Sequence, residues 1–311
     1  MEPAVQALWL GFGAVVITLL ILDLTVFSRR AHAPTIREAA LWSGSLVSVA
    51  LLFGVVVLAV RGLRSGLEYY TGYLIELSLS VDNLLVFLMI FEYFAVPGGM
   101  RPRVLKWGIF GAMLLRGVMI LAGALLLERF AWIIYVFGGL LVVTGWKMWA
   151  DAEIRIEPDK NPLVRLARRF LPVTDTYDGQ RFFTREKRRL AATPLLVVLL
   201  VIDWCDVVFA VDSIPAIFAV TRDPFIVFSS NVFAVLGLRE LFFVLAGAVD
   251  RFRYLKPAVA LILVFVGLKM LLSHWLHVPI GLSLGIVLGT FAGAVGLSLA
   301  RERRASGSPS A

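Results

Sequence analysis

The sequence predicts an all-α membrane protein, a polytopic bundle of about nine transmembrane helices. The first observation is its composition: 59% of the 311 residues are hydrophobic, only 17% are charged, and the mean hydropathy is +0.87. A soluble domain is closer to half apolar and a quarter charged, so this composition excludes a water-soluble enzyme. The single Cys205 excludes a disulfide framework and a cysteine-based zinc site.

The second observation is a series of nine apolar segments. A helix that crosses a bilayer core needs about 20 such residues. The segments cover residues 4–27, 41–60, 67–96, 105–127, 131–150, 194–220, 225–249, 256–274 and 279–300. Glu2 precedes the first segment without any Lys or Arg, and the segment is longer than the apolar region of a signal peptide. We therefore expect it to remain as a membrane span.

The third observation is the placement of the basic residues. Of the 30 Lys and Arg residues, 22 lie in alternate loops and the C-terminal segment, and only four lie in the opposite loops. Loops rich in Lys and Arg stay in the cytoplasm. We therefore expect a multi-pass protein of the plasma or inner membrane, with its N-terminus outside and its C-terminus in the cytoplasm. The high isoelectric point then reflects topology, and no nucleic-acid partner is expected.

Two parts of the chain carry the same motifs in the same order. Residues 76–83 (ELSLSVDN) and 206–213 (DVVFAVDS) both read as an acid, five residues, Asp and a small polar residue. Four further matches follow: Leu115-Arg116 with Leu238-Arg239, Leu121–Gly123 with Leu245–Gly247, Glu128–Phe130 with Asp250–Phe252, and Gly145–Met148 with Gly267–Met270. Each copy holds three spans, so the second copy enters the membrane from the opposite side. Inverted repeats of this kind are typical of transporters, with a substrate site near the midplane.

The repeat divides the chain into five predicted parts. Residues 1–66 hold two N-terminal spans, 67–150 the first three-helix repeat and 151–193 a cytoplasmic loop, in which a short helix is expected at residues 161–171. Residues 194–275 hold the second, inverted repeat. Residues 276–311 hold the last span and a cytoplasmic tail.

Four carboxylates lie well inside the predicted spans: Glu76, Asp82, Asp206 and Asp212. Each costs roughly 2.5–3.5 kcal/mol to insert when it is ionised and unpaired. A bound cation, a proton, water, or pairing with Arg116, Lys147, Arg239 or Lys269 would offset this cost. On a straight helix Glu76 and Asp82 lie about 120° apart, so a helix break would be needed to bring them together. Pro215 favours such a break in the sixth span, because it removes a backbone hydrogen bond.

The predicted metal ligands all supply oxygen. They are Glu76, Asp82, Asn83, Asp203, Asp206, Asp212 and Asn231. Carboxylate and amide oxygens suit Mn²⁺, Mg²⁺ or Ca²⁺ better than Zn²⁺ or Cu⁺. The metal is expected as a transported substrate, so neither a cofactor nor an enzymatic activity is predicted.

The chain resembles the TerC family of membrane proteins, which is named for tellurium resistance, and its Alx-like branch in particular. The resemblance lies in residues 76–97, in residues 193–216 and in the segment from Asp223-Pro224 to Leu238-Arg239. It implies Mn²⁺ efflux, with a link to stress and tellurite in some members. It also implies that the family's acidic residues fall on Glu76, Asp82, Asp203, Asp206 and Asp212. Asp203 departs from the pattern, since many relatives have Glu there.

Three functions remain open from the sequence. The leading prediction is a transporter that exports Mn²⁺ by alternating access between the two repeats. A non-transporting membrane component of a tellurite or stress-resistance complex is the second. An intramembrane aspartyl protease with Asp82 and Asp212 as its dyad is the third, although no Gly-x-Gly-Asp motif precedes either residue. The expected partners are a divalent metal cation and the lipid bilayer, with a homo-oligomer as an open alternative.

Overall fold

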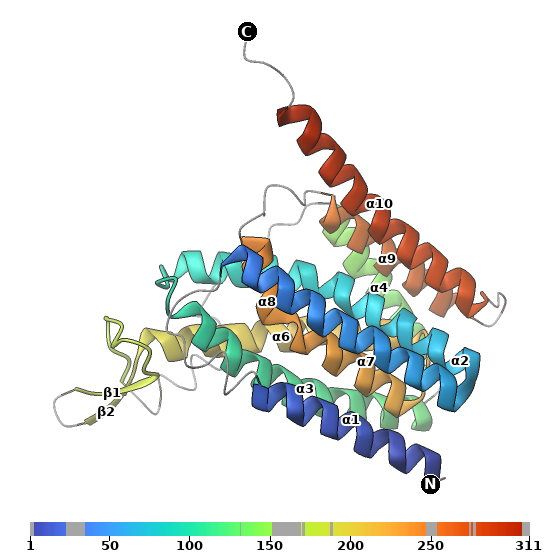
Figure 1. Cartoon of the computed structure of the whole chain (residues 1–311), viewed down its shortest axis with the longest axis horizontal. Helices are drawn as coiled ribbons and strands as arrows, with labels where there is room; N and C mark the ends of the chain where they lie inside the picture. Colours follow the sequence, from blue (N-terminus) through green and yellow to red (C-terminus); the bar gives the residue numbers. More distant parts are fainter. Residues whose placement is uncertain are drawn as a thin grey trace.

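The computed structural model is a bundle of long helices with a small β-hairpin at one end (Figure 1). It describes residues 3–22, 35–130, 132–150, 169, 172–186, 189–246, 254–273, 275 and 278–306. The helices are α1 (Pro3–Leu22), α2 (Ile36–Tyr93), α3 (Arg101–Arg129), α4 (Ile133–Trp149), α6 (Pro194–Phe218), α7 (Pro224–Leu236), α8 (Leu238–Ala246), α9 (Leu255–Leu271) and α10 (Ile280–Ser306). Strands β1 (Phe183–Glu186) and β2 (Arg189–Ala192) pair antiparallel. The predicted helical membrane bundle is confirmed.

Helix α2 is 58 residues long and reverses its direction at Gly62. It begins at a capping box, in which Thr35 and Glu38 bond to each other's backbone N–H groups. Gly62 has φ 86° and ψ 172°, a conformation that glycine adopts without a steric penalty. The Tyr69 hydroxyl donates to the Ala50 carbonyl at 3.0 Å, whereas on one straight helix these residues would lie roughly 28 Å apart. The two halves of α2 are therefore antiparallel neighbours and correspond to the predicted segments 41–60 and 67–96.

Helices α4 and α9 pack through direct backbone contact at glycines. A Cβ atom on Gly145 would lie 2.8 Å from the carbonyl oxygen of Ala260, and one on Gly267 would lie 2.7 Å from that of Gly138. Gly145 and Gly267 are matching positions of the sequence repeat, and the same offset relates Gly138 to Ala260. Contacts that exchange in this way are the signature of a two-fold axis. This is the relation that an inverted repeat requires, while the boundaries of the five predicted parts stay a prediction.

The helix breaks differ from the expected ones. Helix α2 remains helical from Glu76 to Asn83, and its non-helical residue is Gly62. Helix α6 continues through Pro215. A bend of 41° lies instead between α7 and α8, at Gly237. The expected break beside the acidic motif is therefore wrong; the buried carboxylate of Glu76 finds its partner on another helix and needs no distortion of its own.

The described part of the predicted cytoplasmic loop forms the hairpin and packs on the connection between α2 and α3. The Tyr177 hydroxyl donates to the Phe94 carbonyl at 2.7 Å, and the Gln180 amide donates to the Gly99 carbonyl at 2.9 Å. The short helix expected at residues 161–171 lies outside the described residues except for Arg169, which is helical. The hairpin itself was not predicted.

The described residues contain five helices that are long and apolar enough to cross a membrane, and α7 with α8 would form a sixth. Helices α4 and α9 have 17 residues each, at the lower end of the roughly 17–25 residues that a bilayer needs. Each of the nine predicted segments corresponds to one helix, to one half of α2, or to α7 and α8 together. That all nine cross the membrane stays a prediction.

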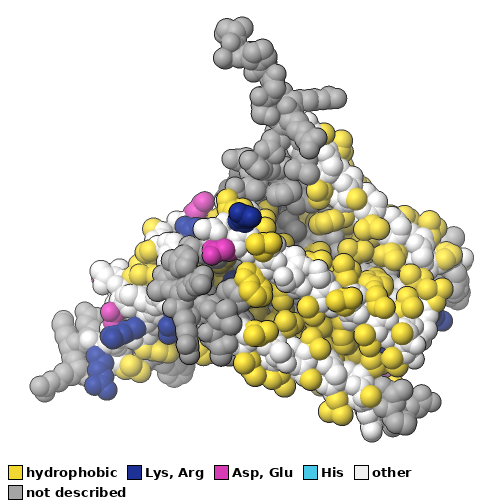
Figure 2. Space-filling model, viewed as in Figure 1, with side chains coloured by type: hydrophobic (Ala, Val, Ile, Leu, Met, Phe, Trp, Pro, Cys, Tyr) yellow, Lys and Arg dark blue, Asp and Glu magenta, His cyan; other side chains and the backbone are white. Residues whose placement is uncertain are grey.

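The outer surface of the bundle is that of an integral membrane protein. Leu10, Leu114 and Trp146 are all more than 70% exposed, at 76%, 71% and 71%. Hydrophobic side chains spread over the visible face of the helices, and Lys and Arg side chains gather around the hairpin end (Figure 2). Such an apolar surface is too large for a soluble monomer. The chain is therefore a multi-pass integral membrane protein.

Candidate functional site

The interior contains a three-residue ion cluster centred on Arg116 of α3. Its guanidinium donates two hydrogen bonds to Asp206 of α6, from Nε at 3.0 Å and from Nη2 at 2.8 Å. Its third nitrogen, Nη1, forms an ion pair with Glu76 of α2. Arg116 and Asp206 are 1% exposed and Glu76 is 0% exposed. Two predicted ligands from the two repeats therefore meet at one buried arginine, the pairing that the sequence left open as an alternative to a bound cation.

Helix α2 carries a stripe of unsatisfied polar groups that begins at Glu76. The Glu76 oxygen that does not contact Arg116, the hydroxyl of Ser80 and the amide nitrogen of Asn83 are buried without a hydrogen-bond partner among the described residues. The spacing of four and then three residues places these side chains on one face of the helix. Buried polar atoms normally find a partner, so this face has unmet capacity to bind a polar ligand.

Helices α6 and α7 carry comparable groups. The hydroxyl of Ser213 and the amide nitrogen of Asn231 are buried and have no hydrogen bond within the described part of the chain. One carboxylate oxygen of Asp203 is likewise unsatisfied. Asp203 lies against α3, where a Cβ atom on Gly111 would come within 2.8 Å of it. A small residue at this position of α3 is what leaves room for the carboxylate.

Asp82 and Asp212 occupy matching positions in the two repeats, but the structure describes only the side chain of Asp212. Asp212 accepts a hydrogen bond from the Thr144 hydroxyl of α4 at 3.0 Å. Asp82 lies in α2, but its side chain is outside the described residues. Among the side chains that are described, no three His, Cys, Asp or Glu residues lie close enough together to hold a metal ion. The metal site of seven residues stays a prediction.

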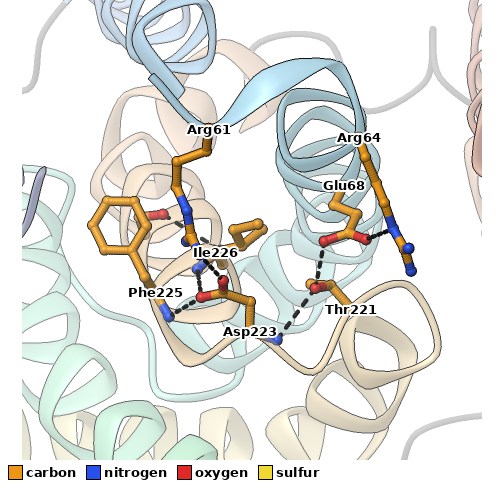
Figure 3. Close-up of polar contacts among 8 residues, drawn as sticks. Arg61, Arg64, Glu68, Thr221, Asp223, Phe225 and Ile226 are labelled. Atoms are coloured by element: carbon orange, nitrogen blue, oxygen red, sulfur yellow. Dashed lines mark hydrogen bonds and ion pairs between the residues drawn. The ribbon is translucent and has the colours of Figure 1, made fainter. Parts of the chain in front are cut away.

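A second polar region lies at the end of the bundle where α2 reverses (Figure 3). There the Glu68 carboxylate accepts hydrogen bonds from Thr221, at 2.7 Å, and from Arg64, at 3.1 Å. Arg61 forms an ion pair of 2.6 Å with Asp223. Asp223 also caps α7 by accepting from two backbone N–H groups of its first turn.

These contacts border an open cleft of about 640 Å³ that includes Glu68, Thr221, Phe218 and Lys269 among its lining residues. The basic-residue rule predicts that this end of the bundle faces the outside. Under that prediction, the cleft opens toward the outer solution.

Comparison with known proteins decides the family. The sequence model of the integral membrane protein TerC family matches residues 61–306 of this chain, a range that includes both predicted repeats. The chain belongs to the TerC family.

Relatives within the TerC family match over nearly the whole chain. An uncharacterized membrane protein of Myxococcus xanthus, STKORF319, is 50% identical over 298 residues, covering 96% of this chain and 93% of the relative. A protein of Escherichia coli (strain K12) named Alx, described as a candidate membrane-bound redox modulator, is 48% identical over 291 residues, which is 91% of each chain. An uncharacterized membrane protein of Rickettsia bellii is 38% identical over 292 residues. No solved structure matches the chain.

Several groups in the interior of this TerC family protein were not among the predicted ligands. Arg116 was one of four basic residues considered as partners of the buried acids. Ser80, Ser213 and Thr144 were not predicted as site residues. The spacing of Ser80 from Glu76 and of Ser213 from Asp206, four and seven residues, does place each hydroxyl on the face of its acid. Thr144 gives no such signal, since it is 68 residues from its partner.

Proposed function

We propose that this TerC family protein is a secondary transporter that exports divalent metal cations across the inner membrane, and that Mn²⁺ is its main substrate. The observation that supports it most is the buried pair of carboxylates, Glu76 and Asp206, with unsatisfied polar groups on the same helix faces. Maintaining such groups inside a membrane is costly and typically marks an ion or substrate path. The cation is cargo, and no resident cofactor is part of the proposal.

The chemistry of the site favours a hard cation. Carboxylate, hydroxyl and amide oxygens are the available donors, and such donors favour Mn²⁺, Mg²⁺ or Ca²⁺. Cys205, the only thiol of the chain, is partly buried against apolar neighbours. Among the described residues, no imidazole joins these oxygen groups and the Cys205 thiol packs with apolar side chains, so the available ligands favour a hard cation over Zn²⁺ or Cu⁺.

The arrangement of the helices supports alternating access. Glu76 belongs to the first repeat and Asp206 to the second, and α4 and α9 pack in a reciprocal manner. Rocking of one repeat against the other would expose the interior to each side in turn. The cleft at Glu68 would then be the exit on the predicted outer side.

The description of the Alx relatives as redox modulators supports a second candidate, a non-transporting membrane component of a stress response. The two candidates differ in their requirement for acidic residues. Export requires the charge on the predicted ligands, whereas a non-transporting component tolerates neutral replacements inside the membrane.

Mn²⁺ uptake by everted membrane vesicles distinguishes the two candidates, because uptake into everted vesicles corresponds to export from the cell. We expect that Asp82→Asn and Asp212→Asn each abolish uptake while the protein remains in the membrane. The replacements keep the side-chain shape and remove the charge. Glu92→Gln is the matched control, since Glu92 is an exposed acid near the C-terminal end of α2, and it should keep full uptake. Normal uptake in both aspartate variants would refute the proposed transport site.

Metal selectivity offers an independent test in cells. Loss of the protein should raise sensitivity to Mn²⁺ more than to Zn²⁺ or Cu²⁺, because the proposed ligands are oxygen atoms. Cellular Mn content under Mn²⁺ load should rise at the same time. Equal sensitisation to all three metals would contradict an oxygen-only site.

A further inference from the structure

Arg116 lies between the two carboxylates that the proposed transport site needs. The guanidinium binds Asp206 through a planar two-bond fork with ordinary lengths of 3.0 and 2.8 Å, the strongest geometry available to an arginine and a carboxylate. Its contact with Glu76 is an ion pair to one carboxylate oxygen. The arginine therefore makes two contacts with the carboxylate of Asp206 and one with the carboxylate of Glu76, whose second oxygen is left without a partner within the described residues.

Charge balance leaves this cluster short of one cation. Two carboxylates share one guanidinium, and all three residues are at most 1% exposed. Charges buried this deeply are not screened by water and remain strongly coupled. A second cation is therefore attracted to the cluster, and it has to compete with Arg116 for the same oxygens.

Glu76 is the carboxylate at which this competition takes place. Ser80 lies on its helix face and brings a buried hydroxyl oxygen that has no hydrogen-bond partner within the described residues. Asp206, by contrast, has both of its oxygens engaged by the fork from Arg116. A cation that reaches the cluster can take Glu76 from the arginine while Arg116 stays attached to Asp206.

We propose that Arg116 is a built-in competitor of the transported cation: it pairs with Glu76, gives up that contact when the ion binds, and drives the ion off by pairing again. This inference rests on the proposed transport function. Arg116 would then be a positioning residue that weakens binding enough for the ion to be released, because a site that holds its ion too tightly does not transport it.

The test measures the affinity of the purified protein for Mn²⁺, by the loss of the electron paramagnetic resonance signal of free Mn²⁺. Removing the competing charge in Arg116→Gln should tighten binding by roughly tenfold or more, given the size of a buried unit charge interaction. Export in everted vesicles should fall in the same variant, because release becomes slow. A purely structural role for Arg116 would not raise affinity while it lowers export.

Arg239→Gln is the matched control. Arg239 occupies the corresponding position in the second repeat, is 9% exposed, and forms an ion pair with Glu240. The variant removes another buried, ion-paired arginine elsewhere in the protein and should leave the affinity for Mn²⁺ unchanged. A tighter affinity in both variants would overturn the specific role of Arg116.

A second variant keeps the proposal testable if Arg116→Gln does not fold. Arg116→Lys retains the charge but loses the planar fork, so it should fold and bind Mn²⁺ more tightly than the wild type but less tightly than a neutral variant. Equal or weaker affinity in the position-116 variants would overturn the competitor role and leave the transport proposal standing. Failure of the folded wild type to bind or export Mn²⁺ would overturn the transport proposal itself.

Discussion

At the scale of single residues, the buried charges around Arg116 have partners from other helices. Arg116 reaches from α3 to Glu76 on α2 and to Asp206 on α6. Removing one member of such a cluster leaves an unpaired charge and costs about 3–5 kcal/mol. The cluster therefore acts as a strong constraint on how these three helices meet, beside any role in binding an ion.

Asp212 depends on a hydroxyl from α4 for its orientation, and this gives a prediction for Thr144→Val. The replacement keeps the branched shape and removes the hydrogen bond of 3.0 Å. A hydrogen bond to a charged group is worth about 1.5–3 kcal/mol, so Mn²⁺ uptake by everted vesicles should slow by roughly tenfold or more.

Thr18→Val is the control for Thr144→Val. The hydroxyl of Thr18 bonds to the Ala14 carbonyl within α1, away from the predicted ligands, and its loss should leave uptake unchanged. Unaltered uptake in Thr144→Val at equal protein abundance would show that Asp212 needs no support from α4.

At the scale of elements, contacts between backbones decide how the repeats join. Gly145 and Gly267 meet carbonyl oxygens of the facing helix, and a carbonyl cannot move aside as a flexible side chain can. A side chain at either glycine would force α4 and α9 apart. We expect Gly145→Leu and Gly267→Leu to lower the yield of folded protein and abolish export.

Gly139→Leu separates this steric effect from the general effect of a leucine in α4. A Cβ atom at Gly139 would have no neighbour within 4 Å, so this variant should be produced and should export normally. The measurement is the monodisperse fraction in detergent, followed by Mn²⁺ uptake. Equal behaviour of the three variants would contradict close packing of α4 on α9.

The start of α7 supplies a second prediction at this scale. Asp223 accepts from the backbone nitrogens of Phe225 and Ile226 and also pairs with Arg61 (Figure 3). Asp223→Asn keeps a good capping side chain and loses the ion pair, which is worth up to about 1 kcal/mol at a partly exposed site. Asp223→Ala loses the cap as well, at a further cost of about 1 kcal/mol. Thermal unfolding should therefore rank wild type above Asn, and Asn above Ala.

The capping interpretation depends on the difference in unfolding temperature between Asp223→Asn and Asp223→Ala. If Asp223→Asn and Asp223→Ala unfold at the same temperature, the side chain does not stabilise the first turn of α7 and only the ion pair contributes.

At the scale of the whole molecule, the distribution of charge and apolar surface predicts how the bundle lies in a membrane. The hairpin end carries many of the basic residues visible in Figure 2, and the opposite end carries Arg61 and Arg64 beside the cleft. Loops rich in Lys and Arg remain on the cytoplasmic side. The cleft is therefore expected to open outward.

A topology experiment tests this orientation. A reporter fused after Arg304 should be cytoplasmic, and a reporter inserted between Arg222 and Asp223 should be external. A third reporter inserted between β1 and β2 should be cytoplasmic and serves as the internal reference. Finding the first two reporters on the same side would remove the nine-span topology and with it the inverted orientation of the repeats.

The sequence by itself determined that this is a helical, multi-pass membrane protein of the TerC family. These properties can be read from short stretches of sequence. The length of an apolar segment is set by the thickness of the bilayer, and a family motif is a short run of neighbouring residues. It also pointed to Glu76 and Asp206 as important acids, because a carboxylate within an apolar segment is costly wherever the helix packs.

Only the tertiary structure decided how those acids are balanced and where the helices turn. Arg116 is 90 residues from Asp206, and nothing in the spacing distinguishes it from the three other basic residues considered as partners. The reversal at Gly62 and the bend at Gly237 likewise replace the break expected beside the acidic motif. The physical reason is the same in each case. The cost of a buried charge is a property of one residue, whereas its compensation depends on which helices pack together.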